Sequence, residues 1–222
     1  LPCPDNFTRY ELASGIRVHV TRPPMEARFQ YEYKLGGGCA FDLTFRGLHE
    51  PFDANDPQHN PLLQTAHGHQ FDERLGTQWG NPSTDPDNPS GHFELIGHIT
   101  GELELRGVRY AVDCFDCVDH SWSQRHETSK RAVSWISAVF GEDYGLHMAM
   151  LLDVRGGKTV YESLRNGYVM HEGKTYGLVS ATVEGYHSHF CPMNIRIVAT
   201  DVRGVRHEVH GNAIAVHPWY NF

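Results

Sequence analysis

The chain has 222 residues, with 19 lysines and arginines against 27 aspartates and glutamates, and a formal net charge of -8 when histidine is neutral. This acidic balance, without a dense basic patch, argues against nucleic acid as a partner. No apolar run reaches the roughly 20 residues that a membrane-spanning helix needs, so we expect no membrane span.

The cysteines are odd in number and scattered: Cys3, Cys39, Cys114, Cys117 and Cys191. Such a set argues against a disulfide framework and favours a reducing compartment, so we predict a cytoplasmic protein. Cys114 and Cys117 have the spacing of metal ligands, but a zinc site of this kind usually needs a second pair, and we expect buried or strand-end thiols instead. Because the sequence starts with Leu1 and not with methionine, we interpret it as a processed or truncated product.

Alternation of apolar and polar residues with a period of two predicts strands from the start of the chain. A first strand is predicted over residues 16–20. Residues 28–35 and 41–46 alternate most regularly, and Gly36-Gly37-Gly38 lies between them. We therefore predict that these two segments form a β-hairpin.

Between about residues 48 and 90 the alternation stops in a stretch rich in Pro, Asn, Asp and His. A segment of this length without strands is rare inside a compact domain unless it is a functional loop or a crossover. We interpret it as a long lid or connector in a partial first β-barrel domain that covers residues 1–105.

Strands resume at Gly91 and continue with short gaps to the C-terminus, in a second β-barrel domain over residues 106–222. Glycine-containing turns separate them at residues 155–158, 172–174 and 203–205. Many short strands with regularly spaced turns predict an all-β fold, an antiparallel barrel or sandwich.

The segment before residue 48 holds too few strands to close a barrel by itself. An open sheet edge invites pairing with another chain, and native proteins usually cover it. We therefore expect either a homo-oligomer or a missing N-terminal segment that completes the first barrel.

Several segments carry a family resemblance: Gly91-His92-Phe93-Glu94, Gly97 to Gly101, Leu105-Arg106-Gly107 and Asp119-His120-Ser121-Trp122-Ser123-Gln124-Arg125. Together they resemble the lipocalin-like superfamily that includes hydroxyneurosporene synthase, the carotenoid hydratase, and relatives with an Asp-His-Ser-Trp-Gly-x-Arg signature. The chain has Ser123 where the signature has glycine, and it is shorter than a typical relative, which tends to have two barrel-like domains. The resemblance covers about half to two thirds of the chain, and it implies calycin-like β-barrels around an apolar pocket.

Addition or removal of water at an alkene needs a proton donor and stabilisation of the resulting cation. A carboxylic acid in an apolar pocket can be the donor because burial raises its pKa. Asp119 is the first candidate for this acid. His120, His92 and His147 lie in patterned strands or at their ends, and imidazole titrates near neutral pH. We predict that one of these histidines is the catalytic partner of Asp119.

Aromatic and charged residues complete the predicted site. Trp122, Trp135 and Tyr168 offer ring faces to an apolar ligand or to a developing cation. Arg125 is expected to orient the catalytic carboxylate, although a direct pair would lower the pKa of that carboxyl and favour a structural clamp. Glu94 belongs to a polar row on one strand, which faces either the barrel interior or the solvent.

The predicted function is that of a cofactor-independent hydratase, dehydratase or isomerase that acts on a hydrophobic small molecule in a β-barrel cavity. A terpenoid, a steroid-like compound or a polyketide would fit such a cavity. Nucleotide cofactors are not expected, because the chain has neither a dinucleotide-binding nor a Walker motif.

Two alternatives stay open. One is a lipocalin-like protein that binds a ligand without converting it. The other is a histidine-ligated metalloenzyme, because imidazoles two residues apart on a strand suit zinc, copper or iron. The candidate ligands for that metal are His67, His69, His187 and His189.

Overall fold

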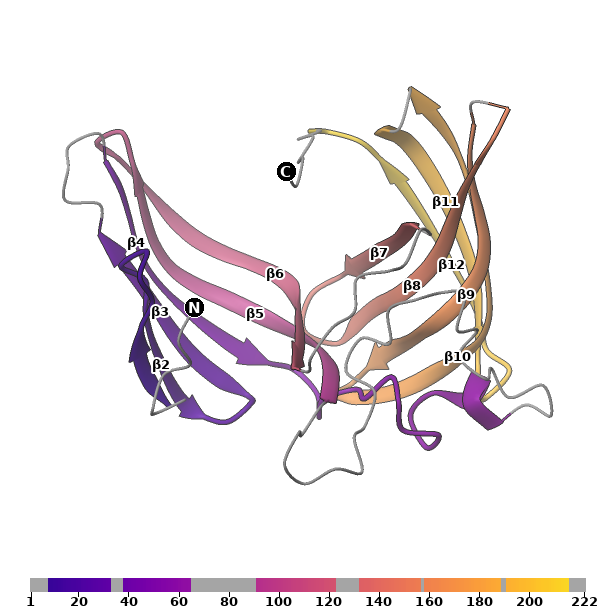
Figure 1. The fold of residues 1–222 in the computed structure, drawn as a ribbon, viewed down its shortest axis with the longest axis horizontal. Helices are drawn as coiled ribbons and strands as arrows, with labels where there is room; N and C mark the ends of the chain where they lie inside the picture. The colour runs from indigo at the N-terminus through magenta and orange to yellow at the C-terminus, as the bar shows by residue number, and fades with distance from the viewer. Residues whose placement is uncertain are drawn as a thin grey trace.

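The computed structural model describes residues 8–32, 38–64, 91–122, 132–156, 158–188 and 191–215. Within these ranges the chain forms two six-stranded sheets, in which every neighbouring pair of strands is antiparallel. Figure 1 shows the sheets as two curved layers that meet at one end of the first sheet. The predicted all-β fold class is therefore confirmed.

Each strand of the first sheet pairs with the next one along the chain. Its strands are β1 (Arg9–Glu11), β2 (Arg17–Arg22), β3 (Glu26–Glu32), β4 (Cys39–Gly47), β5 (Gly91–Leu105) and β6 (Val108–Trp122).

The second sheet has the same meander order. Its strands are β7 (Ala132–Val139), β8 (Tyr144–Arg155), β9 (Lys158–His171), β10 (Lys174–Ser188), β11 (Cys191–Asp201) and β12 (Arg206–Asn212). A 3-10 helix, η1 (Pro61–Gln64), lies between the fourth and fifth strands in the sequence.

The hairpin predicted over residues 28–35 and 41–46 corresponds to β3 and β4, which pair antiparallel. A tight turn joins β5 to β6, where Arg106 and Gly107 have φ values of 52° and 78°. Two residues with positive φ are typical of a type I′ turn, whose twist matches that of the strands it joins.

The β5–β6 hairpin is paired along its whole length, from Gly91 opposite Trp122 to Leu105 opposite Val108. The domain boundary predicted between residues 105 and 106 falls at the turn of this hairpin. The residues on the two sides of that boundary therefore share one sheet, and the two sheets separate between β6 and β7.

Residues 48–64 of the predicted lid or connector are described, and residues 65–90 lie outside the described part. Phe52 exchanges two backbone hydrogen bonds of 2.9 Å with Glu94, and the amide of Leu48 donates to the carbonyl of Ile96. This segment therefore continues the pairing of β4 along the edge of β5.

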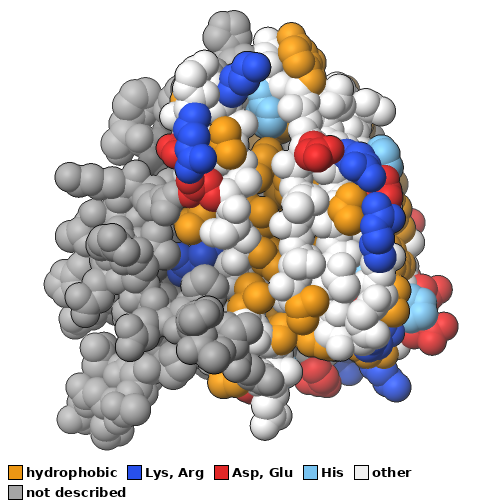
Figure 2. Space-filling model, turned by 90° about the vertical axis from the view of Figure 1, so that its right-hand side faces the viewer, with side chains coloured by type: hydrophobic (Ala, Val, Ile, Leu, Met, Phe, Trp, Pro, Cys, Tyr) orange, Lys and Arg blue, Asp and Glu red, His pale blue; other side chains and the backbone are white. Residues whose placement is uncertain are grey.

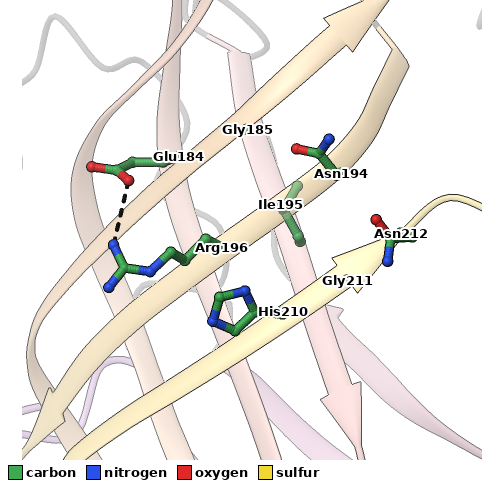
Figure 3. Close-up of a pocket in the computed structure, with 8 residues that line it drawn as sticks. All are labelled: Glu184, Gly185, Asn194, Ile195, Arg196, His210, Gly211 and Asn212. Atoms are coloured by element: carbon green, nitrogen blue, oxygen red, sulfur yellow. Dashed lines mark hydrogen bonds and ion pairs between the residues drawn. The ribbon is translucent and has the colours of Figure 1, made fainter.

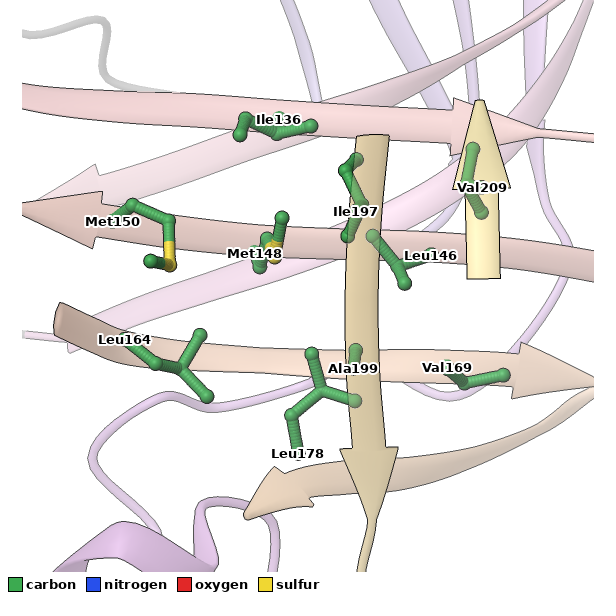
Figure 4. Close-up of a cluster of buried hydrophobic side chains, with 10 residues drawn as sticks. All are labelled: Ile136, Leu146, Met148, Met150, Leu164, Val169, Leu178, Ile197, Ala199 and Val209. Atoms are coloured by element: carbon green, nitrogen blue, oxygen red, sulfur yellow. The ribbon is translucent and has the colours of Figure 1, made fainter. Parts of the chain in front are cut away.

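The main hydrophobic core lies inside the second sheet, which is a curled half-barrel. In Figure 4, β11 carries Ile197 and Ala199 across β8 and β9, so their side chains meet Leu146 and Val169. Complete burial of side chains of this size contributes about 1.5–3 kcal/mol each. The buried members are Ile136, Leu146, Met148, Met150, Leu164, Val169, Leu178, Ile197, Ala199 and Val209.

A second core, here called the junction core, joins the two sheets. It consists of Phe52, Ala54, Ile96, Tyr168 and Met170. The ring of Phe52 stacks on that of Tyr168 with 4.6 Å between centroids. The connector thus packs between β5 of one sheet and β9 of the other.

Figure 2 looks onto the second-sheet side of the molecule, where hydrophobic side chains lie in rows along the strands between polar and charged ones. No helix in the described residues has the length and apolarity required to cross a membrane. Cys39, Cys114 and Cys117 are free thiols.

Candidate functional site

A cluster of buried polar side chains lies where the two sheets meet. His92 and Glu94 come from β5, His147 from β8 and Tyr168 from β9, and each whole residue is at most 3% exposed. A buried polar group costs free energy unless it is paired, so the contacts within this cluster decide what it can do.

The carboxylate of Glu94 lies between two imidazoles. Its Oε1 is 2.8 Å from Nε2 of His92, and its Oε2 is 3.3 Å from Nε2 of His147. The period of two places His92 and Glu94 on the same face of β5, whereas His147 reaches the carboxylate from the second sheet. Each sheet thus supplies one imidazole to the same carboxylate.

The charges of these groups stabilise each other. Burial raises the pKa of the Glu94 carboxyl. The hydrogen bonds and positive charges of His147 and His92 lower it by more, so this pKa lies below its usual value. Burial lowers the pKa of His147, but Cys117 and Glu94 outweigh it and raise this pKa to about 10. Glu94 and His147 therefore form a buried ion pair at neutral pH.

The hydroxyl of Ser137 holds the orientation of the His147 ring. The two residues are cross-strand neighbours on β7 and β8, and Oγ of Ser137 is 2.8 Å from Nδ1 of His147. The other ring nitrogen, Nε2, is buried and makes no hydrogen bond of good geometry, although it lies 3.3 Å from Oε2 of Glu94. It is therefore directed toward the centre of the cluster.

His49 connects the connector segment to both sheets as a neutral group. Its Nδ1 lies 2.6 Å from the carbonyl of Glu50 and donates to it, while its Nε2 accepts from the amide of Ile96 at 2.9 Å. The hydroxyl of Tyr168 lies 3.1 Å from the same Nε2. Burial lowers the pKa of His49 to about 4, which agrees with a neutral ring.

Cys117 lies on β6, and its Sγ is 3.7 Å from Oε2 of Glu94 and 4.0 Å from the hydroxyl of Tyr168. Burial and the neighbouring acidic groups raise the pKa of Tyr168 well above its ordinary value. The cluster thus contains a thiol, a carboxylate, an imidazole and a protonated phenol in contact.

Asp119 lies at the rim of the cluster and not inside it. It is on the same face of β6 as Cys117, and its side chain is 39% exposed. The expectation that Asp119 is the buried carboxyl is therefore wrong, because its place near the end of the strand leaves it at the surface. The fully buried carboxyl is its cross-strand neighbour Glu94.

His92 links the buried carboxylate to the exposed one. Its Nε2 is bonded to Glu94, and its Nδ1 lies 3.5 Å from Oδ1 of Asp119, an ion-pair distance without a hydrogen bond of good geometry. The side chains of Asp119, His92, Glu94 and His147 thus form a continuous line of acid and base groups from the surface to the junction core.

Trp135 of β7 lies alongside both imidazoles. Its ring centroid is 6.0 Å from that of His92 and 5.8 Å from that of His147, with interplanar angles of 31° and 26°. The indole is only partly buried, so it offers an apolar surface beside the line of acid and base groups.

Over residues 1–222 the chain matches the model of a family described as a domain of unknown function, DUF7064. The chain belongs to this family. Neither a curated protein nor a solved structure matches it.

The other predicted site residues of this DUF7064 chain lie apart from the cluster or outside the described residues. His120 is on the opposite face of β6, where its ring stacks on Phe93 with 5.2 Å between centroids. Trp122 is the last residue of β6, and its side chain is outside the described part. Arg125 is also outside it. The structure thus brings together His92, Glu94, His147, Tyr168 and Trp135 with Asp119 at the rim.

The histidine pairs of the metalloenzyme alternative lie largely outside the described residues, which include only His187. Its ring lies near Tyr161, with 3.4 Å between Nε2 and the hydroxyl. The predicted metal ligands His67, His69 and His189 are outside the described part.

Sequence reasoning missed His49 and Ser137 as members of the site, and it considered Cys117 only as a thiol or as part of a cysteine pair. Cys117 could have been predicted as a member of the site, because it is two residues from Asp119 and therefore lies on the same face of the strand. His49 had no such signal, since it lies in a segment without periodicity.

Two surface hollows of this DUF7064 chain lie away from the cluster. One, of about 360 Å³, lies over β10, β11 and β12, where Arg196 reaches toward Glu184 at 3.5 Å (Figure 3). The other, of about 290 Å³, lies over β1, β2 and β3 and is lined by Arg9, Arg17 and Arg28. Arg196 and Arg28 are engaged by neighbouring carboxylates.

Proposed function

We propose that this chain catalyses proton transfer on a hydrophobic small molecule, as a hydratase, dehydratase or isomerase, at the junction of the two sheets. The observation that supports the proposal best is the line of acid and base groups from the half-exposed Asp119 through His92 to the buried Glu94. Such a line can deliver a proton to a ligand and recover it without a cofactor.

Asp119 is the group that exchanges the proton with the ligand, because it is the exposed member of the line. His92 carries the proton between the two carboxylates, since one of its ring nitrogens faces each of them. Glu94 keeps His92 oriented, in the way that a buried carboxylate orients a catalytic imidazole.

The indole of Trp135 supports the hydrophobic character of the ligand. A ring face beside the proton donor binds apolar carbon and attracts a carbocation formed by protonation of an alkene. The resemblance to the lipocalin-like superfamily of carotenoid hydratases agrees with an apolar ligand, and we extend it to this chain as part of the proposal. A terpenoid alkene or alcohol is the ligand class that fits best.

Solvent-deuterium incorporation tests the proposal. The purified chain is incubated in D₂O with a panel of terpenoid alkenes, terpenoid alcohols and unsaturated ketones, and mass spectrometry measures the deuterium gained by each compound. We expect incorporation with the wild type and its loss in Asp119→Asn, with unchanged thermal unfolding.

Asp113→Asn is the matched control. Asp113 lies on the same face of β6 and pairs with His98 at 2.6 Å, but its side chain is 79% exposed and distant from Glu94 along the strand. This variant is expected to keep full activity. Binding of the compounds without deuterium gain would favour the ligand-carrier alternative, and equal loss of activity in both variants would contradict the role given to Asp119.

A further inference from the structure

Three side chains of the cluster present metal-binding atoms to one point. They are the carboxylate of Glu94 on β5, the thiol of Cys117 on β6 and the imidazole of His147 on β8, whose ligand atoms all lie within 4.8 Å of one another. The set spans both sheets, so a bound ion would connect them.

The separations fit tetrahedral coordination. Bonds of about 2.0–2.3 Å at tetrahedral angles place ligand atoms about 3.3–3.6 Å apart. Oε2 of Glu94 is 3.3 Å from Nε2 of His147 and 3.7 Å from Sγ of Cys117. The third separation, between Sγ of Cys117 and Nε2 of His147, is below 4.8 Å, so an ion that contacts all three side chains requires Cys117 and His147 to move no more than about 1 Å closer together.

The nitrogen of His147 is an independent sign of a ligand. Nε2 is buried in a side chain that is 4% exposed, and it makes no hydrogen bond of good geometry in the described part of the chain. Oε2 of Glu94 lies 3.3 Å away as its ion-pair partner, and an ion placed between Glu94 and Cys117 would give this nitrogen a partner of better geometry.

The supporting contacts are those of metal sites. The second nitrogen of a metal-bound imidazole usually contacts a hydrogen-bonding group, and the Nδ1 of His147 has the hydroxyl of Ser137 at 2.8 Å. The second oxygen of Glu94 is held by His92 at 2.8 Å. Both ligands are therefore fixed in orientation from outside the three-ligand set.

The charges select the kind of ion. A thiolate, a carboxylate and a neutral imidazole carry two negative charges, which neutralise a divalent cation in a buried place. Binding would release the thiol proton of Cys117 and the proton shared by Glu94 and His147. Sulfur and nitrogen ligands suit Zn²⁺ and disfavour Mg²⁺ and Ca²⁺.

We propose that Glu94, Cys117 and His147 bind one Zn²⁺ ion with tetrahedral geometry, with the fourth position left for water or another small ligand. This inference goes beyond the proposed function and does not rest on it. In the metal-bound form Asp119 and His92 are not ligands of the ion. Glu94 then contacts the ion with one carboxylate oxygen and His92 with the other.

Cobalt spectroscopy tests the site without any substrate. The full chain, reduced and freed of metal by chelation, is titrated with Co²⁺, and absorption is followed in the visible and near-ultraviolet ranges. We expect saturation at about one equivalent, intense visible bands of four-coordinate cobalt and a thiolate-to-cobalt charge-transfer band. Addition of Zn²⁺ is expected to remove all of these bands.

Cys114→Ser is the matched control for Cys117→Ser, because both cysteines lie on β6 but Cys114 is exposed on the other face. The charge-transfer band is expected to disappear in Cys117→Ser and to persist in Cys114→Ser. Ser137→Ala is expected to keep the band and to weaken Zn²⁺ binding by about 10–100-fold.

The wild-type titration decides the proposal even where a variant fails to fold. Absence of a charge-transfer band, or a band that is unchanged in a folded Cys117→Ser variant, would overturn it. Neither result would affect the deuterium test of Asp119, so failure of the metal site and failure of the proposed function are distinguishable.

Discussion

Asp201 carries the clearest prediction about pH and stability. Its side chain is fully buried at the end of β11 and receives hydrogen bonds from the backbone amides of Arg203 and Val205 at 2.8 and 3.2 Å. The guanidinium of Arg203 and the ring of His207 contact its other oxygen at 2.6 and 3.0 Å. We expect Asp201→Asn to lose the charged part of these contacts.

The size of the expected loss in stability follows from the pKa of Asp201. Burial raises the pKa of Asp201, but Arg203 and His207 outweigh it and bring it from 3.8 to about 2. The folded state thus prefers the ionised carboxylate, and a difference of this size is worth about 2 kcal/mol. This stability is fully present above pH 4 or so and is lost as the pH falls toward the folded-state pKa, with about 1 kcal/mol remaining near pH 3.

Urea unfolding followed by circular dichroism at about pH 7 and at about pH 3 measures the effect. We expect Asp201→Asn to lower the free energy of unfolding by about 2 kcal/mol at the higher pH and by about half of that at the lower one. For a chain of this length the higher value corresponds to a melting temperature about 4–8 °C lower.

Asp153→Asn is the matched control. Asp153 also pairs with the arginine two residues later, but its side chain is 43% exposed. Exposed pairs of this kind contribute about 0–1 kcal/mol, so the control variant is expected to stay close to the wild type. A loss in Asp201→Asn that is the same at both pH values, or no larger than in the control, would refute the reasoning.

Three further variants, the first with a matched control, test the packing and one polar contact. Leu146→Ala empties a fully buried position of the main core and is expected to cost about 2–5 kcal/mol in urea unfolding, whereas Val154→Ala at a 52% exposed position stays within about 0.5 kcal/mol. Gly97→Ala places a Cβ against the ring of Phe45 and is expected to lower the melting temperature by overpacking worth about 1–3 kcal/mol; an unchanged melting temperature would contradict that contact. Tyr168→Phe removes one hydroxyl from the cluster and is expected to cost about 1 kcal/mol, and a stabler variant would show that this hydroxyl is poorly paired.

The all-β class and several of the strands could be predicted from local pattern alone. Alternation with a period of two identified β3 and β4, and the glycines at residues 156, 173 and 204 marked hairpin turns, where the structure gives them positive φ. What the pattern could not predict is how the second sheet curls and where it meets the first. Those features depend on contacts such as Phe52 with Tyr168, which join segments far apart in the sequence.

The candidate site could likewise be predicted only in part from the sequence. Periodicity placed His92 and Glu94 on one face of a strand but could not tell whether that face was the interior or the solvent side. The second sheet decides it, because His147 covers Glu94 from β8. Asp119 shares that face, yet it lies beyond the covered part of the strand and is exposed. How far each position of a strand is covered by the other sheet depends on tertiary packing, and the alternation of residues does not predict it.

The polar cluster is a poor means of stabilising the junction between the sheets. A buried ion pair such as Glu94 with His147 gains little over apolar side chains of similar volume, and replacement of such pairs by hydrophobic residues is often neutral or stabilising. The junction core already supplies apolar contacts at the same place through Phe52, Ile96 and Met170. Glu94 and His147 belong to different sheets, so the chemistry that we propose for the cluster requires the two sheets to pack together.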